Sequence, residues 1–147
     1  MRVVFGADHA GYLLKEPLIR AAEAAGHSVA DLGTNSPGPV DYPDFAAAVA
    51  HEVAAGRADR GVVVCGSGAG ASIAANKVRG VRAATCHDEA TVRNSRAHNN
   101  ANVLALGAGS LSAGHARRLV KVWLATPFEG GRHARRVDKI DALDRER

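Results

Sequence analysis

Two kinds of hydrophobic pattern alternate along the chain. Continuous runs rich in valine are typical of buried strands, whereas apolar residues that recur every three or four positions are typical of amphipathic helices. The runs predict five strands, at residues 2–7, 27–33, 61–66, 81–86 and 102–107. The recurring pattern predicts six helices, at residues 13–26, 45–56, 70–77, 88–98, 112–125 and 133–147, and the longest loop spans residues 34–44. Pro17 lacks an N–H, so the first helix is expected to become regular close to it.

This alternation predicts the class of fold. Strands separated by helices form βαβ units, which build a parallel sheet with helices on both faces. We therefore predict an α/β fold of three layers around a five-stranded parallel sheet, in one domain that spans residues 1–147. The last helix has no further strand to cover. Its apolar positions, Val137, Ile140 and Leu143, need another surface, for which a partner subunit is one candidate.

Composition and charge argue against several functions. Aromatic residues make up only 4% of the chain, and modules that bind nucleic acid by base stacking need aromatic platforms. No apolar run is long enough for a transmembrane helix, and the N-terminus lacks the pattern of a signal peptide. We therefore expect neither nucleic acid nor a membrane as a partner. Cys65 and Cys86 make no disulfide framework, so a cytoplasmic protein with reduced thiols is expected.

The net charge of +4 comes largely from the C-terminal part of the chain. A basic cluster there suits the binding of phosphate groups, although its spacing does not say which kind. The basic residues concerned are Arg117, Arg118, Lys121, Arg132, Arg135, Arg136 and Lys139.

Polar side chains gather where the predicted strands end. In open parallel sheets, ligands bind beyond the carboxyl ends of the strands. Asp8 and His9 follow the first strand, and residues 65–70 follow the third. Residues 98–100, His-Asn-Asn, lie at another strand edge, from which side chains are expected to reach the same crevice. The triplet 86–88, Cys-His-Asp, is interpreted as structural, because the side chains of adjacent residues diverge.

The segment VVVCGSGAGASIAANK, residues 62–77, contains a glycine-rich turn after a predicted strand. Gly66, Gly68 and Ala71 fit the dinucleotide-binding pattern G-x-G-x-x-G/A, and Asp88 lies 22 residues beyond Gly66. Two observations speak against a dinucleotide. The turn follows the third strand rather than the first, and the chain leaves little room for a substrate domain.

A second interpretation of the turn involves its cysteine. The N–H groups of residues 66–70 can form a cradle for negative charge that develops on a substrate, with Cys65 as a nucleophile or base at its edge. The start of a helix also favours the thiolate form of a cysteine. In a third interpretation Cys65 is an ordinary buried core residue. Neither a P-loop nor an H-E-x-x-H or C-x-x-C pattern occurs, so we predict no metal site.

Taken together, these segments resemble the ribose-5-phosphate isomerase B family, which also includes the subunits of galactose-6-phosphate isomerase. The similarity covers nearly the whole chain, and several separate motifs occur in the right order. They are FGADHAGYLLK (5–15), DLGT (31–34), DYPDFA (41–46), VCGSGAGASIAANK (64–77), VRAATC (81–86), SRAHNNANVLALG (95–107) and FEGGRHARRVDKI (128–140).

The resemblance implies a Rossmann-like fold and an aldose–ketose isomerase that acts on a sugar phosphate without a cofactor. Ribose 5-phosphate and ribulose 5-phosphate are the implied substrate pair, with a tetrose phosphate, a hexose phosphate or a free sugar as alternatives. It also implies a homodimer or homotetramer with active sites at the subunit interface, where the C-terminal helix packs on a partner. A Rossmann-type nucleotide-binding module and a non-catalytic subunit of a hetero-oligomer remain alternative interpretations.

The resemblance also implies roles for individual residues. Cys65 is the base that moves a proton between C1 and C2 through an enediolate, and Ser67 passes a proton between the two oxygens. His98, assisted by Asp8, opens the sugar ring. The implied substrate-binding residues are His9, Tyr42, Gly66, Gly68, Ala69, Gly70, Asn99, Arg132 and Arg136, of which His9 and the two arginines bind the phosphate.

Three positions distinguish this chain within the family pattern. Some members replace the cysteine and use a glutamate just after the glycine turn, where this chain has Ala71, so it resembles the cysteine type. Ser67 stands where threonine is common and keeps the hydroxyl. Gly109 stands where many relatives carry a phosphate-binding arginine, so either one phosphate contact is lost or Arg117 or Arg118 replaces it.

Overall fold

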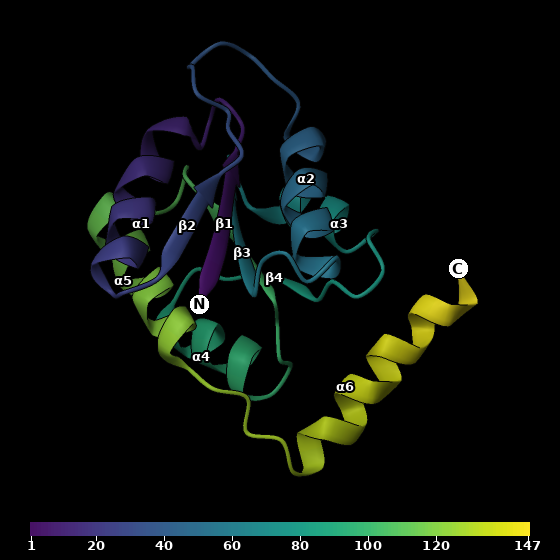
Figure 1. The fold of residues 1–147 in the computed structure, drawn as a ribbon. Helices are drawn as coiled ribbons and strands as arrows, with labels where there is room; N and C mark the ends of the chain where they lie inside the picture. The colour runs from purple at the N-terminus through teal and green to yellow at the C-terminus, as the bar shows by residue number, and fades with distance from the viewer.

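The computed structural model describes residues 1–147 and contains one parallel sheet with helices on both faces (Figure 1). The predicted α/β fold and its five strands are therefore confirmed. The strands are β1 (Arg2–Ala7), β2 (Ser28–Asp31), β3 (Arg60–Cys65), β4 (Ala83–Thr85) and β5 (Val103–Gly107), in the spatial order β2-β1-β3-β5-β4. The helices are α1 (Tyr12–Ala24), α2 (Tyr42–Ala54), α3 (Ala69–Ala75), α4 (Glu89–Ala97), α5 (Ala113–Ala125) and α6 (Arg132–Leu143), and a 3₁₀ turn (Asp144–Glu146) ends the chain. No helix combines the length and the apolar character needed to cross a membrane.

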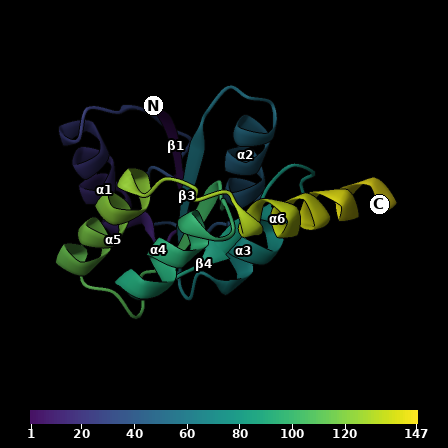
Figure 2. The same cartoon turned by 90° about the horizontal axis from the view of Figure 1, so that it is seen from below.

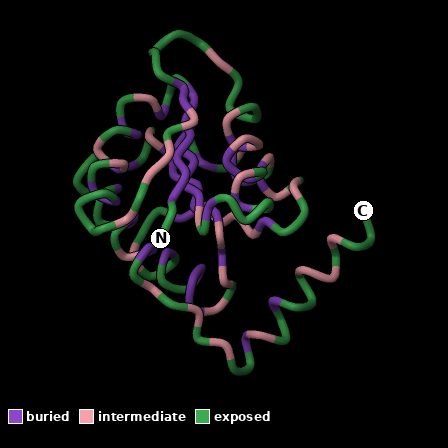
Figure 3. The backbone as a smooth tube through the Cα atoms, viewed as in Figure 1, coloured by how far each residue is buried: buried purple, intermediate pink, exposed green.

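The sheet separates two cores, because successive side chains of a strand point to opposite faces. Helices α1, α4 and α5 cover one face, where Val62 and Val64 of β3 join a core that contains Phe5 and Trp123. Helices α2 and α3 cover the other face, where Cys65 lies among small side chains, mostly alanine and valine. The buried backbone in Figure 3 accordingly follows the strands. This alternation places the Cys65 side chain on the α2–α3 side of the sheet.

Helix α1 lies where the sequence predicts it, within two residues at each end, but it is regular well before Pro17. Its first residue is Tyr12, five positions before Pro17, and Pro17 lies inside the helix. The Asp8 carboxylate accepts the N–H groups of Ala10 (2.9 Å) and Gly11 (3.0 Å), which fixes the chain in a turn before the helix. The Gly11 carbonyl then accepts the first helical hydrogen bonds. The helix is thus nucleated before the proline, which removes only one later hydrogen bond.

The order in which the chain adds strands changes direction between β1 and β3, at the middle of the sheet. From β1 the chain moves outward to β2, and then crosses to β3 on the other side of β1. The carboxyl ends of β1 and β3 are therefore neighbours at a topological switch point, where ligands bind in open α/β sheets. Ala7 at the end of β1 pairs with Val64 of β3, and Cys65 pairs with Gly107 at the end of β5. Asp8, Cys65 and the turn after β5 consequently lie at one edge of the sheet.

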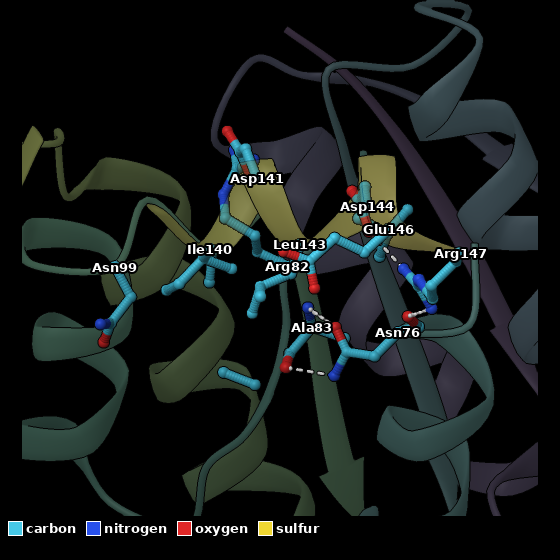
Figure 4. Close-up of a pocket in the computed structure, with 13 residues that line it drawn as sticks. Asn76, Arg82, Ala83, Asn99, Ile140, Asp141, Leu143, Asp144, Glu146 and Arg147 are labelled. Atoms are coloured by element: carbon cyan, nitrogen blue, oxygen red, sulfur yellow. Dashed lines mark hydrogen bonds and ion pairs between the residues drawn. The ribbon is translucent and has the colours of Figure 1, made fainter. Parts of the chain in front are cut away.

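Helix α6 extends away from the sheet (Figures 1 and 2). Only His133 and Val137 are buried on it, whereas Ile140 is 42% and Leu143 57% exposed. Its far end is tied to the body by polar contacts, including an ion pair of 2.8 Å between Arg82 and Asp141. A groove of about 750 Å³ remains between this helix, α3 and β4, and Ile140 and Leu143 line it (Figure 4). The helix therefore keeps an apolar face that the chain itself does not cover.

We predict that Gly11→Ala strongly destabilises the fold. A Cβ atom at residue 11 would lie 2.3 Å from the carbonyl oxygen of Val64, so the turn and β3 would have to separate. Overpacking of this kind costs about 1–3 kcal/mol or more, which denaturant unfolding measures. Gly114→Ala is the matched control, because its surroundings are open and an alanine stabilises a helix by about 0.5–1 kcal/mol relative to glycine. Equal stability of the two variants would contradict the close contact.

Candidate active site

Cys65 lies at the carboxyl end of β3 with its sulfur against the glycine turn. The residue is 3% exposed, and the Gly68 N–H donates to Sγ at 3.2 Å. Gly68 has a φ of +81°, the left-handed conformation that glycine adopts most readily. This conformation turns the Gly68 N–H back toward the sulfur. Cys65 is therefore buried like a core residue and lies at the predicted site.

The glycine turn offers free hydrogen-bond donors. The N–H groups of Gly66, Ser67, Gly70 and Ala71 donate to no acceptor within the chain. Most buried or partly buried N–H groups in proteins are paired, so such a group of free donors is a feature of anion-binding turns. The Ser67 hydroxyl oxygen accepts the Ala69 N–H at 3.2 Å, which leaves the hydroxyl proton available. Of the five donors in the predicted cradle, Gly66, Ser67 and Gly70 are free, whereas Gly68 and Ala69 donate within the turn, and binding of an anion there stays a prediction.

The dinucleotide interpretation fits this geometry poorly. The Tyr42 ring lies directly over the turn, because a Cβ atom at residue 70 would come within 2.5 Å of its Cζ. Asp88, the expected ribose ligand, instead caps α4: its Oδ1 accepts the Thr91 N–H at 2.8 Å. The structural interpretation of residues 86–88 gains further support from Cys86, since burial raises the pKa of its thiol.

Asp8 and His9 meet the same edge of the sheet from β1. Asp8 is 6% exposed, and its Oδ1 is occupied by two backbone N–H groups of the following turn. The exposed His9 ring contacts the loop after β2, where Nδ1 lies 3.1 Å from the Val40 N–H and 3.2 Å from the Val40 carbonyl oxygen. In the tautomer whose Nδ1 accepts the Val40 N–H, Nε2 carries the ring proton. Both contacts of Nδ1 orient the ring so that Nε2 faces solvent.

A cavity of about 470 Å³ opens beside the turn. Gly109 lines it and adds no side chain, while its N–H donates to the Gly66 carbonyl at 3.0 Å. Ser110, which the sequence interpretation does not single out, faces the same space, and so does His87, so the structural interpretation of residues 86–88 fits Cys86 and Asp88 but not His87. Their position follows from strand order, because β5 lies beside β3 and β4 lies beside β5. The cavity is lined by Gly66, Ser67, Ala69, Thr85, His87, Gly109 and Ser110.

The remaining predicted site residues lie at the opposite edge of the sheet. His98 is the C-cap of α4, and this helix runs back toward the amino ends of the strands (Figure 1). Asn99 lines the groove beside α6, together with Arg82 and Ala83 at the start of β4 (Figure 4). Arg132 and Arg136 begin α6 near the same edge. Within one chain, therefore, the structure does not bring His98 to Asp8 or Cys65. The expectation that residues 98–100 reach the crevice of their own chain is wrong, because the helix direction carries them away from it.

His98 belongs to a cluster that the sequence interpretation misses. Its ring stacks on the His133 ring with centroids 4.2 Å apart and planes inclined by 12°. The Glu129 carboxylate oxygen Oε2 lies 4.0 Å from Nε2 of His98 and 3.7 Å from Nε2 of His133. Burial, His98 and Arg132 lower the pKa of His133. In the sequence, only the i,i+4 spacing of Glu129 and His133 indicates that two of these three residues lie close together.

This cluster also has the residue types of a metal site. One ligand atom from each of His98, Glu129 and His133 lies within 4.8 Å of the others. Imidazole nitrogens bind a metal in the plane of the ring. The two nearly parallel rings do not direct their nitrogens to one point, so metal binding would require the stack to separate.

Comparison with known proteins places the chain in a family. The sequence model of the ribose/galactose isomerase family matches residues 3–140. The chain belongs to this family. It is 42% identical to ribose-5-phosphate isomerase B of Escherichia coli, over 99% of this chain and 98% of that protein. It is 39% identical to D-erythrulose-4-phosphate isomerase of Pectobacterium atrosepticum, over 95% and 93%.

A solved structure agrees with these sequence relationships. Ribose-5-phosphate isomerase B of Clostridium thermocellum superposes with a TM-score of 0.97 at 46% identity, and 99% of each chain is covered. The resemblance that the motifs indicate is thus confirmed, together with the Rossmann-like fold. As a family member the chain is an aldose–ketose isomerase of the sugar-phosphate isomerase type.

We predict that the two backbone hydrogen bonds of Asp8 stabilise the fold independently of any chemistry. Asp8→Asn keeps an oxygen that can accept them, whereas Asp8→Ala removes it and should cost about 1 kcal/mol, as loss of a helix cap does. Thermal unfolding of both variants measures the difference. Asp44→Ala serves as a control, because Asp44 is exposed in the first turn of α2. An alanine variant at residue 8 as stable as the asparagine variant would contradict this role.

Proposed function

We propose that this isomerase interconverts ribose 5-phosphate and ribulose 5-phosphate without a cofactor. The observation that carries the proposal is Cys65, buried at the end of β3 beside a turn with free N–H donors, in a chain of this family. Similarity to two ribose-5-phosphate isomerases B at 42% and 46% identity supports the five-carbon substrate.

In the proposed reaction the Cys65 thiolate removes the proton from C2 of the open aldose and returns it to C1. The intermediate is an enediolate, whose oxygens carry negative charge. The free N–H groups of the turn are the donors that stabilise this charge, and loss of one such donor costs a factor of about 10²–10³. The Ser67 hydroxyl, with its proton free, transfers a proton between the two oxygens. Asp8 and Tyr42 close the site on either side.

Ring opening and phosphate binding need residues from the other edge of the sheet. We assign these steps to His98, Asn99, Arg132 and Arg136 of a second copy of the chain, together with Asp8 and His9 of the first. The uncovered apolar positions of α6 and the groove beside it support packing against another copy. The Nε2–H of His9 is the donor for the phosphate. The assembly is accordingly a homodimer or a homotetramer built from such dimers.

A four-carbon substrate is the second candidate. Similarity to the D-erythrulose-4-phosphate isomerase of P. atrosepticum favours it, since its identity of 39% is close to that of the ribose enzymes. The cavity at Gly109 also lacks a fixed positive charge, because its wall contains no lysine or arginine. Sugar phosphates that differ by one carbon hold the phosphate at different distances from the reacting carbons. Where the phosphate lies relative to this cavity therefore decides which of the two substrates fits.

We predict that the purified chain isomerises ribose 5-phosphate with a higher kcat/KM than erythrose 4-phosphate or a hexose 6-phosphate. The measurement is a coupled or NMR assay on all three sugars with the protein alone. Faster turnover of the four-carbon sugar would select the second candidate. Absence of turnover on every sugar would contradict the proposed function and favour a non-catalytic subunit. Cys86→Ala is the control for thiol chemistry, because Cys86 lies in the other core.

A further prediction concerns the sharing of the site. Cys65→Ala and His98→Ala should each lose at least about 10²-fold in kcat, as expected for a missing acid or base. Mixed dimers, coexpressed with two tags and purified through both, should recover about half of the wild-type activity. In a symmetric dimer, one of their two sites has both residues intact. Mixed dimers no more active than either variant alone would rule out a site made by two chains.

A further inference from the structure

The stacked pair of His98 and His133 joins two distant segments of the chain. His98 ends α4, and His133 lies in the first turn of α6. The Glu129 N–H donates to the Ala97 carbonyl at 3.0 Å, which attaches the segment before α6 directly to the end of α4. The His133 side chain is only 10% exposed, whereas that of His98 is 39% exposed. One ring is therefore a fixed platform, and the other faces solvent.

Arg96 holds the backbone beneath the pair. Its Nε donates to the Thr126 carbonyl at 3.2 Å, and its Nη1 donates to Asn100 Oδ1 at 2.9 Å and to the Ala101 carbonyl at 2.6 Å. These contacts hold Thr126 in the segment before Glu129, and Asn100 and Ala101 just after His98. The fold thus brings the two segments together, and the exposed side chain of Glu129 reaches both rings from there.

The Glu129 carboxylate faces both histidine rings, and the two rings differ in their surroundings. Glu129 is the acidic group that faces them, and the basic groups around His133 are His98, Arg132 and Arg136. Burial is the largest cause that lowers the pKa of His133, and the nearby positive groups lower it further. Two stacked rings cannot both be charged without repulsion. The buried inner ring therefore favours its neutral form.

We propose that Glu129 and His133 are positioning residues for His98, which together keep its ring oriented as the acid for sugar-ring opening. This inference rests on the proposed role of His98. In the step, the C1–O4 bond breaks and its electron pair goes to O4, which receives the proton from His98. The hydroxyl proton on C1 passes to Asp8, and the C1–O1 bond becomes the aldehyde. His133 supplies the flat platform, and Glu129 supplies the balancing charge.

A pair of substrates distinguishes this role from a structural one. Ribose 5-phosphate closes a five-membered ring through O4, and the enzyme has to open it. Erythrose 4-phosphate carries its phosphate on O4, so it cannot close that ring and needs no ring opening. We expect Glu129→Gln and His133→Ala to lower kcat/KM for ribose 5-phosphate about 10-fold, within the range of a positioned acid. Their kcat/KM for erythrose 4-phosphate should stay within about two-fold of wild type.

Two further variants serve as controls. His133→Phe keeps a flat ring for stacking and should recover most of the activity lost in His133→Ala. Glu23→Gln changes an exposed carboxylate on α1 and should alter neither substrate. An equal loss on both sugars in Glu129→Gln, or no loss on either, would overturn the positioning role.

A measurement without substrate separates this inference from the proposed function. The ring C–H resonance of His98 is followed by NMR against pH in wild type and in Glu129→Gln. We expect its titration midpoint to move to lower pH by about 0.5–1 unit when the carboxylate charge is removed. An unchanged midpoint would overturn the inference even in an active isomerase. A shifted midpoint in a protein that isomerises neither sugar would support the coupling of Glu129 to His98 and contradict the proposed function instead.

Discussion

The contact between the turn after β1 and the end of β3 determines how the site is built. Gly11 lies against the Val64 carbonyl so closely that no side chain fits, and Asp8 holds this turn through two backbone hydrogen bonds. The contact sets Asp8 and His9 beside Cys65, although Asp8 and Cys65 are 57 positions apart along the chain. It also starts α1 at Tyr12, so the same few atoms position a helix, a strand and the candidate chemistry. Because the contact of Gly11 with Val64 positions all three, we expect Gly11 to tolerate little substitution.

One face of the sheet carries the larger hydrophobic side chains, and the other face carries the candidate chemistry. The face covered by α1, α4 and α5 carries the large side chains, including Phe5 and Trp123, which supply most of the apolar burial. The face toward α2 and α3 is built from small residues, so these helices lie close to the sheet and Tyr42 reaches the glycine turn. Cys65 points to this second face because it comes directly after Val64 in a strand. Side-chain alternation alone thus decides which helices surround the sulfur.

Local signals predict most of the fold, but only part of the site. Valine-rich runs locate all five strands, and the glycine turn after the third strand identifies Cys65. Pro17 misleads, because a tertiary contact at Gly11 nucleates α1 before the proline. The cluster at His98 depends on where α6 lies, and periodicity predicts that helix without placing it. The edge to which His98 belongs could have been deduced, however, because a helix between parallel strands returns its C-terminus to their amino ends.

The separation of the two residue groups, together with the proposed assembly, accounts for a further feature of the chain, its projecting helix. A parallel sheet presents to one crevice only the groups at the carboxyl ends of its strands, which here are a thiol, a carboxylate, a histidine and backbone donors. The arginines and His98 lie at the other edge, about 16 Å away by the rise of a five-residue strand. Helix α6 has 12 residues and is about 18 Å long. In the proposed dimer, two copies packed through their α6 helices would bring the basic edge of one to the crevice of the other, which a single chain of this topology cannot do for itself.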